Sequence, residues 1–335
     1  MLYLQQGWGD FMLTGSRILV TGGTGSFGHK FVQMTLESHN PEQIIIYSRD
    51  EMKQWEMALK FKHNPKLKFV IGDIRDYQNL FKVMHDVNFV VHAAATKIVP
   101  TAETNPAECI KTNIIGAMNV VDACINSGVK KVVALSTDKA SNPINLYGAS
   151  KLASDKLFIA ANTHSTLFSV VRYGNVIGSR GSVIPFFLSL KGKGSLPITD
   201  ARMTRFMITL DESIALVWDV LSDMHGGEIY TKKIPSMLLT DIAKAIDPEA
   251  SFEIVGIRPG EKIHEQMISI DDAPYTYEYE DYYKIIPATY TQSQKNESTK
   301  VGKLVDSKFI YSSENNTDWM SIDDLKGQIK LMYPN

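Results

Sequence analysis

A tyrosine and a lysine four residues apart, Tyr147 and Lys151, have types and a spacing that suggest chemistry. Positions i and i+4 lie on one face of a helix, so the two side chains would meet. An ammonium group beside a phenol, with a nicotinamide cation beyond it, stabilises the phenolate and lowers the tyrosine pKa from about 10 toward neutrality. Tyr147 can then remove a proton from a hydroxyl group while hydride leaves the same carbon.

A second pair of ionisable residues, Asp138 and Lys139, follows Thr137 directly after an apolar run at 132–136 that predicts a strand. A carboxyl group and an amine at the end of a buried strand can serve as an acid and a base. That chemistry needs the Asp138 pKa raised and the Lys139 pKa lowered, and burial in a closed site shifts both in those directions. The alternative is an ion pair on the surface.

A glycine-rich turn separates a predicted strand at 17–21 from a helical pattern at 26–38. This is the context of a dinucleotide-binding motif, because the helix N-terminus presents N–H groups and a positive dipole end to a pyrophosphate. We therefore predict a cofactor site there, and the alternative is a glycine-rich turn without a ligand. The residues of this turn expected to contact the cofactor are Gly22, Thr24, Gly25, Ser26, Phe27 and Gly28.

The end of the second predicted strand, at 44–48, indicates which dinucleotide binds. Enzymes that use NAD usually have an acidic residue there, on the ribose 2′-hydroxyl. This chain has Ser48 and Arg49 at the strand end and Lys53 one helical turn later, and these side chains favour the 2′-phosphate of NADP. The alternative is that Arg49 caps a helix or pairs with a neighbouring carboxylate.

Further cofactor contacts are expected at the ends of the third and fourth predicted strands. Asp73 would accept a hydrogen bond from the adenine amino group, and Ile74 would lie against the ring. The small residues Ala93, Ala94 and Ala95 would let the backbone approach the cofactor closely. His92, just before them, is interpreted as a structural histidine rather than a catalyst.

Short runs rich in Val and Ile alternate with helical patterns from residue 17 to about 172, which predicts strands buried on both faces. The sequence therefore predicts an α/β fold with a doubly wound parallel sheet of the NAD(P)-binding Rossmann type. Predicted strands lie at 17–21, 44–48, 69–72, 87–92, 132–136 and 168–172, and a long helix at about 106–127. Predicted domains are a disordered extension at 1–15, an NADP-binding domain at 16–178 rejoined by about 205–235, and a mainly substrate-binding lobe at 179–335, with 276–300 as a surface excursion.

The composition excludes several classes of protein. The 335 residues include 35 Lys and Arg against 37 Asp and Glu, a net charge of −2, without the basic excess of a nucleic-acid or membrane-surface binder. No stretch is long and apolar enough to span a membrane. Only Cys109 and Cys124 are present, which favours reduced core cysteines in a cytoplasmic protein. No metal site is predicted.

With these motifs in place, the chain resembles the extended short-chain dehydrogenase/reductase family of nucleotide-sugar enzymes. The resemblance runs from about Arg17 to the C-terminal region. It depends on the stretches TGGTGSFG, IIIYSRDE, GDIRD, CIKTNI, ALSTDKA, NLYGASKL, RYGNVIGSRGSVIPFF, LPITDARMTRFMI, GGEIY, GIRPGEKIHE and YSSENNTDW. One departure is Ile98, where the family pattern leads us to expect a histidine; Lys97 beside it is retained.

Within that family the resemblance is strongest to enzymes that dehydrate UDP-N-acetylglucosamine with inversion at C5, the first step of pseudaminic acid biosynthesis. It implies that Tyr147 deprotonates O4, Lys139 as a neutral amine takes the C5 proton, and Asp138 protonates the departing O6. Thr137 and Lys151 complete the implied catalytic set. The implied product is UDP-2-acetamido-2,6-dideoxy-β-L-arabino-hexos-4-ulose. A tightly bound NADP would be recycled within each turnover.

The resemblance also implies the substrate contacts and a homo-oligomer, with a hexamer as one candidate. Asn175 would contact the sugar or its phosphate, and Arg205 and Arg258 the UDP pyrophosphate. The full set of implied substrate-binding residues is Lys97, Thr137, Tyr147, Asn175, Thr199, Met203, Arg205, Arg258 and Glu261. The loop at 179–182 is interpreted as nearer to a subunit interface than to the sugar.

Three alternatives remain open at this stage. A dehydratase that retains the C5 configuration would use the same groups. A UDP-hexose 4-epimerase needs no acid–base pair at Asp138 and Lys139, so that pair disfavours it. An NADP-sensing protein without activity typically loses the tyrosine, whereas Tyr147 and Lys151 are both present.

Overall fold

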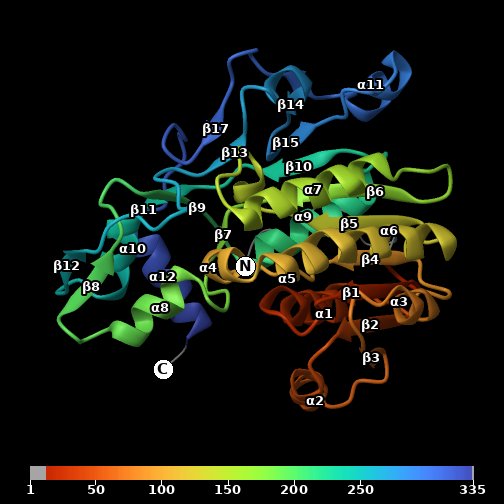
Figure 1. Ribbon diagram of the computed structural model, residues 1–335, viewed down its shortest axis with the longest axis horizontal. Helices are drawn as coiled ribbons and strands as arrows, with labels where there is room; N and C mark the ends of the chain where they lie inside the picture. The colour runs from red at the N-terminus through yellow and green to blue at the C-terminus, as the bar shows by residue number, and fades with distance from the viewer. Residues whose placement is uncertain (1–12, 334–335) are drawn as a thin grey trace.

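The computed structural model describes residues 13–333 and contains one large, mostly parallel sheet (Figure 1). Its strand order is β16-β14-β15-β10-β6-β5-β4-β1-β2-β3, and the part from β3 to β10 is parallel. The parallel strands are β1 (Arg17–Thr21), β2 (Gln43–Ser48), β3 (Leu67–Ile71), β4 (Phe89–His92), β5 (Lys131–Leu135), β6 (Leu167–Arg172) and β10 (Ile229–Lys232). This order is that of a doubly wound dinucleotide-binding fold, which confirms the predicted fold class.

The apolar runs of the sequence form these strands because helices cover the sheet on both faces. Ile44, Ile45 and Ile46 of β2 are fully buried, as are Val90 and Val91 of β4. The six strands expected from the sequence are all present, with ends that differ from the prediction by at most two residues.

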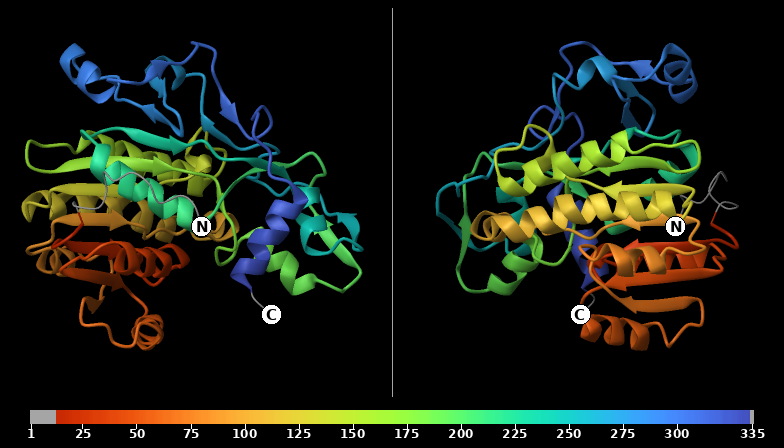
Figure 2. Two further views of the ribbon diagram at one scale, coloured as in Figure 1. Left: turned by 180° about the vertical axis from the view of Figure 1, so that it is seen from behind. Right: turned by 45° about the vertical axis from the view of Figure 1, so that its right-hand side comes forward.

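Two layers of helices enclose the sheet. Helices α1 (Ser26–Ser38) and α9 (Leu210–Asp223) pack together on one face, seen from behind in Figure 2. Helices α3 (Tyr77–Val83), α6 (Gly116–Asn126) and α7 (Leu146–Ala160) pack in a row on the other. Further helices are α2 (Glu51–Lys60), α4 (Val99–Thr104) and α5 (Pro106–Ile110).

The long helix predicted at about 106–127 is interrupted. A π-helical turn, η1 (Lys111–Ile115), lies between α5 and α6. At this turn the buried Asn113 side chain exchanges hydrogen bonds with the backbone of Thr96 and donates another to the Ser150 hydroxyl. The apolar periodicity indicated a helix here but carried no signal for the extra residue per turn.

The second lobe has its own core and lies beside the carboxyl ends of the parallel strands (Figures 1 and 2). It contains a three-stranded sheet of β7 (Asn175–Val176), β9 (Thr204–Ile208) and β11 (Ser236–Leu238), and the pair β8 (Ser195–Ile198) with β12 (Ser251–Ile254). Helices α8 (Val183–Leu190), α10 (Leu239–Ile246) and α12 (Ile322–Met332) pack around them. The pair β13 (Gln266–Ile268) with β17 (Tyr311–Ser312) borders both lobes.

Residues 276–304 correct the predicted domain division. The sequence placed 276–300 in a surface excursion of the second lobe, but this segment extends the large sheet with antiparallel strands. These are β14 (Thr276–Glu278), β15 (Tyr282–Ile285) and β16 (Lys303–Leu304), accompanied by η3 (Ala273–Tyr275) and α11 (Gln292–Ser298). β15 pairs with β10, so the tyrosine-rich segment covers what would be the sheet edge.

The N-terminal prediction of disorder at 1–15 concerns mostly residues outside the described range. Within that range, Leu13 is buried in the main core and the Gly15 N–H donates to the Asn40 carbonyl, so residues 13–15 are ordered. Cys109 and Cys124 are buried and unpaired, as predicted. Over residues 13–333, none of the helices has the length and hydropathy required to cross a membrane.

Candidate active site

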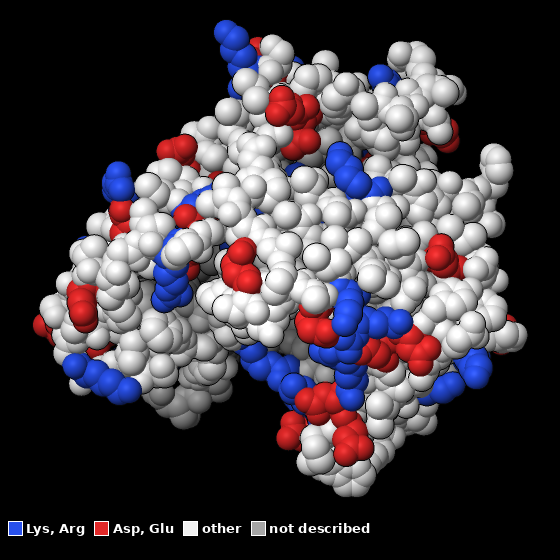
Figure 3. Space-filling view, in the orientation of Figure 1, with Lys and Arg blue, Asp and Glu red and all other residues white. Residues whose placement is uncertain are grey.

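A cleft of about 1330 Å³ lies between the two lobes. The face drawn in Figure 3 is hollowed there, with Lys and Arg side chains at the edge of the hollow. The cleft borders the carboxyl ends of the parallel strands, where open α/β sheets bind ligands. Of the residues predicted to bind cofactor or substrate or to act in catalysis, two do not line it: Gly28 and Met203.

The glycine turn fits a dinucleotide pyrophosphate. Gly22 has a φ of +65°, and a Cβ there would lie 2.9 Å from the Ala94 backbone. A Cβ at Gly28 would lie 2.1 Å from the Gly23 carbonyl oxygen, so Gly28 serves the close packing of α1 rather than the cleft surface. Helix α1 begins at Ser26, and its N-cap residue Gly25 provides no side-chain hydrogen bond, which leaves the N-terminal N–H groups to face a phosphate.

Ser48, Arg49 and Lys53, which were expected to favour NADP over NAD, line the cleft at the end of β2. Arg49 is largely exposed, and its guanidinium lies 3.8 Å from the Asp73 carboxylate. Lys53 pairs at 2.7 Å with Asp50, the residue whose carboxylate caps α2. Arg49 therefore pairs neither with Asp50 nor with Glu51, which were the alternative partners.

Asp73 already has a partner in this structure. Both of its carboxylate oxygens accept hydrogen bonds from Arg75 at 2.7–2.9 Å, from the side chain and from the backbone N–H. Burial raises the Asp73 pKa, but the Arg75 hydrogen bonds and charge outweigh burial, so the pKa lies below its usual value. Ile74 beside it is buried at the edge of the cleft.

The segment after β4 also borders the cleft. Ala93, Ala94 and Ala95 line it, and the backbone N–H groups of the first two donate to the Thr21 hydroxyl. His92 is buried and hydrogen-bonded to the same hydroxyl at 2.8 Å, which agrees with a structural histidine. Burial, with a smaller contribution from the Lys151 charge, lowers its pKa to about 3.

Arg180 occupies a place that the sequence did not predict. The loop at 179–182 was interpreted as lying near a subunit interface, but it lies against the glycine turn. The Arg180 guanidinium donates to the Thr24 carbonyl, and its backbone N–H donates to the Ser26 hydroxyl. Its carbonyl accepts a 3.0 Å hydrogen bond from Lys97. Burial and the Arg180 charge lower the Lys97 pKa.

Helix α7 places Tyr147 and Lys151 toward the cleft, and its N-terminus is capped by the Asn145 side chain. Burial raises the Tyr147 pKa to about 12, although the Lys139 charge and a hydrogen bond with Thr137 act in the opposite direction. The cation that acts most strongly on the phenol is therefore Lys139 rather than Lys151. The side chains of the described residues therefore raise the Tyr147 pKa and do not by themselves lower it toward neutrality as the sequence predicted.

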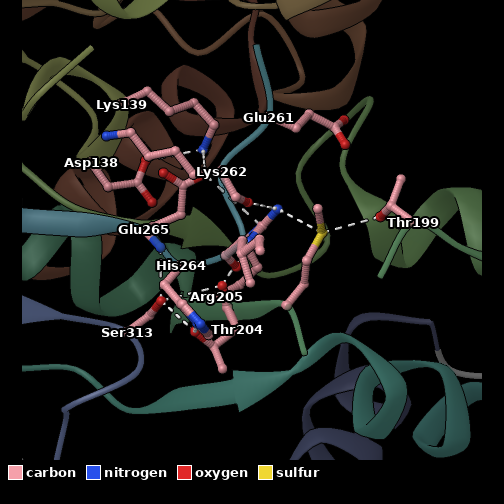
Figure 4. Close-up of polar contacts among 12 residues, drawn as sticks. Asp138, Lys139, Thr199, Thr204, Arg205, Glu261, Lys262, His264, Glu265 and Ser313 are labelled. Atoms are coloured by element: carbon pink, nitrogen blue, oxygen red, sulfur yellow. Dashed lines mark hydrogen bonds and ion pairs between the residues drawn. The ribbon is translucent and has the colours of Figure 1, made fainter. Parts of the chain in front are cut away.

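Asp138 and Lys139 lie in η2 (Asp138–Ala140), directly after β5, and form an ion pair with 3.1 Å between Oδ1 and Nζ. Lys139 forms a second ion pair, also at 3.1 Å, with Oε1 of Glu265 (Figure 4). Both carboxylates are buried, so this pair is not the surface ion pair considered as the alternative. Asp138 and Lys139 of the sheet domain are thus in contact with Glu265 of the second lobe.

The pKa shifts in this cluster confirm one sequence expectation and contradict another. Burial raises the Asp138 pKa, and the Glu265 charge adds to that shift. Burial alone would lower the Lys139 pKa, but the charges of Asp138 and Glu265 outweigh it and raise the pKa above its usual value. The predicted downward shift of the Lys139 pKa is therefore wrong, because the prediction counted burial without the second carboxylate.

The sequence reasoning missed Glu265. Its only signal was its position at the end of the stretch GIRPGEKIHE, which was quoted for the resemblance without a role for this residue. Two neighbouring groups fix the segment that carries it: the Lys262 ammonium donates to the Ser141 carbonyl at 2.7 Å, and the Arg205 guanidinium donates to the carbonyls of Lys262 and Ile263.

Most of the predicted substrate contacts line the cleft, and one of them, Met203, is buried behind its wall. Asn175 and Thr199 line the cleft, as do Arg258 and Glu261, which form a 3.4 Å ion pair with each other. Met203 is fully buried behind them, which corrects its assignment as a substrate contact. Its sulfur accepts hydrogen bonds from the Thr199 hydroxyl and the Arg205 guanidinium, so it supports other candidates (Figure 4).

Arg205 also differs from its expected role. Its guanidinium donates to three backbone carbonyls, those of Thr204, Lys262 and Ile263. Most of its hydrogen-bonding capacity is therefore used within the protein, although the side chain still borders the cleft. In this structure it holds the segment of Glu265 in place.

Residues 18–287 match the family model described as "Polysaccharide biosynthesis protein". The chain belongs to this family. A curated relative from Campylobacter jejuni subsp. jejuni serotype O:23/36 (strain 81-176), a UDP-N-acetylglucosamine 4,6-dehydratase (inverting), is 55% identical over 94% of this chain and 97% of its own length. A UDP-glucose 4-epimerase from Rickettsia conorii is 43% identical over 82% of this chain and 84% of its own length.

Solved structures place the family in the same fold. The X-ray structure of Pen from Bacillus thuringiensis has a TM-score of 0.87, is 32% identical, and covers 96% of this chain and 99% of its own. A dTDP-glucose 4,6-dehydratase, DesIV from Streptomyces venezuelae, solved with NAD and TYD bound, has a TM-score of 0.68 and is 25% identical over 74% of this chain and 86% of its own. Both support the interpretation of the chain as a short-chain dehydrogenase/reductase fold.

Proposed function

We propose that this protein is an inverting 4,6-dehydratase of UDP-N-acetylglucosamine. The observation that carries the proposal is the contact between Asp138 and Lys139 at the end of β5, in the same cleft as Tyr147 and the glycine turn. Oxidation at C4 needs only a tyrosine and a dinucleotide, whereas loss of water across C5 and C6 needs a base and an acid together. The curated relative of that activity, aligned over almost the whole chain, supports the assignment.

The cofactor of the proposed reaction is NADP. The glycine turn and the uncapped start of α1 would hold its pyrophosphate, and Arg49 and Lys53 its 2′-phosphate. When bound, the nicotinamide supplies the hydride chemistry at C4 and C6 and ends the cycle unchanged. The exposed Arg49 guanidinium and the absence of an acidic residue at positions 48 and 49 favour NADP over NAD.

Tyr147 is the proposed acceptor of the O4 proton. Its raised pKa means that the phenol is protonated in the protein alone, so proton removal from the sugar depends on added positive charge at the site. Lys139 supplies part of that charge and the Thr137 hydroxyl stabilises the phenolate further. Lys151, one turn along α7, also lines the cleft and would hold the nicotinamide half of the cofactor.

Lys139 and Asp138 are proposed to act as one proton relay. In the resting state Lys139 is cationic, so it must lose a proton before it can act as a base. The Asp138 oxygen lies 3.1 Å away and has a raised pKa, so it can accept that proton. The transfer leaves a neutral amine and a neutral acid, the two species that the elimination needs.

The elimination then restores the resting charges. The C5–H bond breaks and a new N–H bond forms on Lys139, while the carboxyl proton of Asp138 passes to O6 as the C6–O6 bond breaks and water leaves. Lys139 is again cationic and Asp138 anionic. The proton that reaches O6 is the one that Lys139 first gave to Asp138, and the C5 proton replaces it on Lys139, so the pair neither gains nor loses a proton.

The wider biological assignment follows the proposed reaction. The product would be the 4-keto-6-deoxy sugar of L-arabino configuration that opens pseudaminic acid biosynthesis. We propose a cytoplasmic homo-oligomer as the working form, with a hexamer as one candidate. Lys97, Asn175, Thr199, Arg258 and Glu261 remain the proposed contacts to the UDP-sugar.

A UDP-hexose 4-epimerase is the second candidate, because relatives 41–43% identical to this chain carry the name UDP-glucose 4-epimerase. The two candidates give different products from one substrate. Proton NMR of purified protein with UDP-N-acetylglucosamine in D₂O, without added reductant, decides between them. A new C6 methyl signal, deuterium at C5 and L-arabino couplings are the expected result. D-xylo couplings from the first minutes would indicate a retaining enzyme, and UDP-N-acetylgalactosamine without a methyl signal would indicate the epimerase.

A further inference from the structure

Glu265 is a buried carboxylate in the active-site cleft that the proposed reaction has not yet used. It precedes β13, in the segment that crosses from the second lobe to η2, and is 2% exposed. Its Oε1 lies 3.1 Å from the Lys139 amine and 3.9 Å from the Arg205 guanidinium. Its other oxygen has no hydrogen-bond partner among residues 13–333, although buried polar atoms are normally paired.

Lys139 is surrounded by five charged or titratable groups from four parts of the chain. Asp138 is its neighbour in η2, Glu265 comes from the second lobe, and Arg205 comes from β9. Two further groups are Lys262, on the same segment as Glu265, and Tyr147, on α7. The two carboxylates contact Lys139 directly, so they dominate its surroundings.

The two contacts also restrict the direction of the amine. Asp138 accepts a hydrogen bond from Lys139, and Glu265 forms an ion pair with it at the same distance of 3.1 Å, so two contacts hold the amine. The amine is also open to the cleft, since Lys139 lines it and its side chain is 24% exposed. Without Glu265 the amine would have one fixed contact and could rotate about it.

We propose that Glu265 is a positioning residue: it aims the Lys139 amine at the sugar and supplies the counter-charge when that amine takes the C5 proton. This inference rests on the proposed dehydratase function. It concerns the C5 step alone and leaves oxidation at C4 to Tyr147 and the cofactor. The proposed base therefore depends on both lobes, because Lys139 belongs to the sheet domain and Glu265 to the second lobe.

Glu265 keeps its negative charge through the proposed cycle. Burial raises its pKa, but the charges of Lys139, Arg205 and Lys262 outweigh burial and lower it below the usual value. The proton taken from C5 therefore stays on Lys139, and the proton exchange within the cluster is between Lys139 and Asp138, without Glu265. The role of Glu265 is electrostatic and geometric: no bond to it forms or breaks.

The test is Glu265→Gln, which keeps the size and removes the charge, with Glu253→Gln as the matched control. Glu253 is an exposed residue of β12 in the same lobe and outside the cleft. Wild type, variant and control are mixed with UDP-N-acetylglucosamine bearing deuterium at C5. Absorbance of reduced nicotinamide follows oxidation at C4, and NMR follows the C6 methyl group.

We expect the variant to form methyl product about 100-fold more slowly, which is the low end of general acid–base contributions, and to keep C4 oxidation within about 3-fold of wild type. The C5 deuterium isotope effect rises, because the C5 step becomes more strongly rate-limiting. The Glu265 charge raises the pKa of both Lys139 and Asp138, so its loss moves the alkaline limb of the pH profile to lower pH. A merely structural role would not move that limb.

Each other outcome is also decisive. Equal product rates in wild type and Glu265→Gln, or an unshifted alkaline limb, would overturn the role of Glu265 while leaving the dehydratase proposal intact. Wild type that forms no methyl product would overturn the proposed function itself. If Glu265→Gln does not fold, Glu265→Asp replaces it: retained charge with a shorter reach predicts a lower rate with an unshifted pH profile, and a shifted profile would count against the inference.

Discussion

Two lysines of the cleft, Lys151 and Lys139, have pKa values shifted in opposite directions. Lys151 lies on α7, is 3% exposed, and has its pKa lowered by burial, with partial compensation from Asp155. Lys139 lies in η2 between two carboxylates at 3.1 Å, and its pKa is raised. Burial acts in the same direction on both, so the number of carboxylates in direct contact decides the sign.

The difference extends to the carboxylates themselves. Asp155 lies one turn beyond Lys151 but contacts other partners. It forms an ion pair with the Arg172 guanidinium at 3.5 Å and accepts a hydrogen bond from the Ser136 hydroxyl at 2.7 Å. Asp138 and Glu265 instead both face Lys139. The comparison teaches that a buried lysine in this fold can keep a lowered or a raised pKa according to what its nearest carboxylate is already bound to.

The largest effect on activity is expected when Lys139, the lysine with the raised pKa, is replaced. Lys139→Ala should still oxidise the sugar at C4, more slowly because Tyr147 loses the Lys139 charge, but lose about 1000-fold in methyl product because no base reaches C5. NMR of the product and absorbance of reduced nicotinamide measure the two steps. Lys139→Arg is the matched control: it keeps the charge between Asp138 and Glu265 but cannot be deprotonated, so it should fold and be equally inactive. Normal turnover by either variant would refute the base assignment.

On the other side of the comparison, Asp155→Asn should cost about 3 kcal/mol in the free energy of unfolding, because it leaves the buried Arg172 guanidinium short of a partner. Asp272, at 3.7 Å from the same guanidinium, limits the loss. Denaturant unfolding measures the difference, and Asp122→Asn on α6 serves as a control for the loss of one carboxylate. A loss below 1 kcal/mol, about the value of an exposed pair, would show that Asp155 is not the main partner of Arg172.

A third basic group, Arg49, sharpens the comparison because it is exposed and has only a long ion pair, with Asp73 at 3.8 Å. Its charge is therefore available to a ligand. Arg49→Ala should weaken NADP⁺ binding about 10-fold and leave NAD⁺ binding nearly unchanged, as expected for loss of one phosphate contact. Calorimetric titration with both dinucleotides measures this, and equal weakening of the two would mean that Arg49 has a structural role.

The smallest effect expected is on the pH dependence of stability. A lysine with a raised folded-state pKa stabilises the fold below its unfolded pKa of about 10.4, and this contribution is lost as pH rises through the folded-state pKa. A lysine with a lowered pKa destabilises the fold at neutral pH, and that penalty disappears toward pH 10.4. Relative to wild type, Lys139→Met should lose on the order of 1 kcal/mol at neutral pH and less at alkaline pH.

Lys151→Met should show the opposite trend, with a gain at neutral pH that shrinks at alkaline pH. Denaturant midpoints of the two variants at neutral and alkaline pH provide the measurement. Parallel curves for both would mean that the two lysines do not differ as described.

Much of the site was predictable because its residues lie in short, continuous stretches. The glycine turn, Ser48 with Arg49, and the Tyr147–Lys151 pair each depend on a strand end or on one face of one helix. Local periodicity and turn chemistry determine such features. The doubly wound parallel sheet followed from the alternation of strands and helices for the same reason.

Other features depended on contacts between distant parts of the chain. Periodicity did not indicate the π-turn at η1, the use of β14–β16 as sheet strands, or the position of Arg180 against the glycine turn. Met203 was assigned to the substrate from its motif, but packing places it behind Thr199 and Arg205. In each case the deciding partner belongs to another element of the structure.

The sequence by itself determined the fold class, the cofactor turn and the residue types of the acid–base pair, because these are written in local patterns. Only the tertiary structure decided the charge of that pair. Coulomb interactions fall with distance and strengthen where water is excluded, so the Lys139 pKa depends on which side chains packing brings within a few ångströms. The second lobe brings Glu265 there, and that contact reverses the shift that burial alone would give.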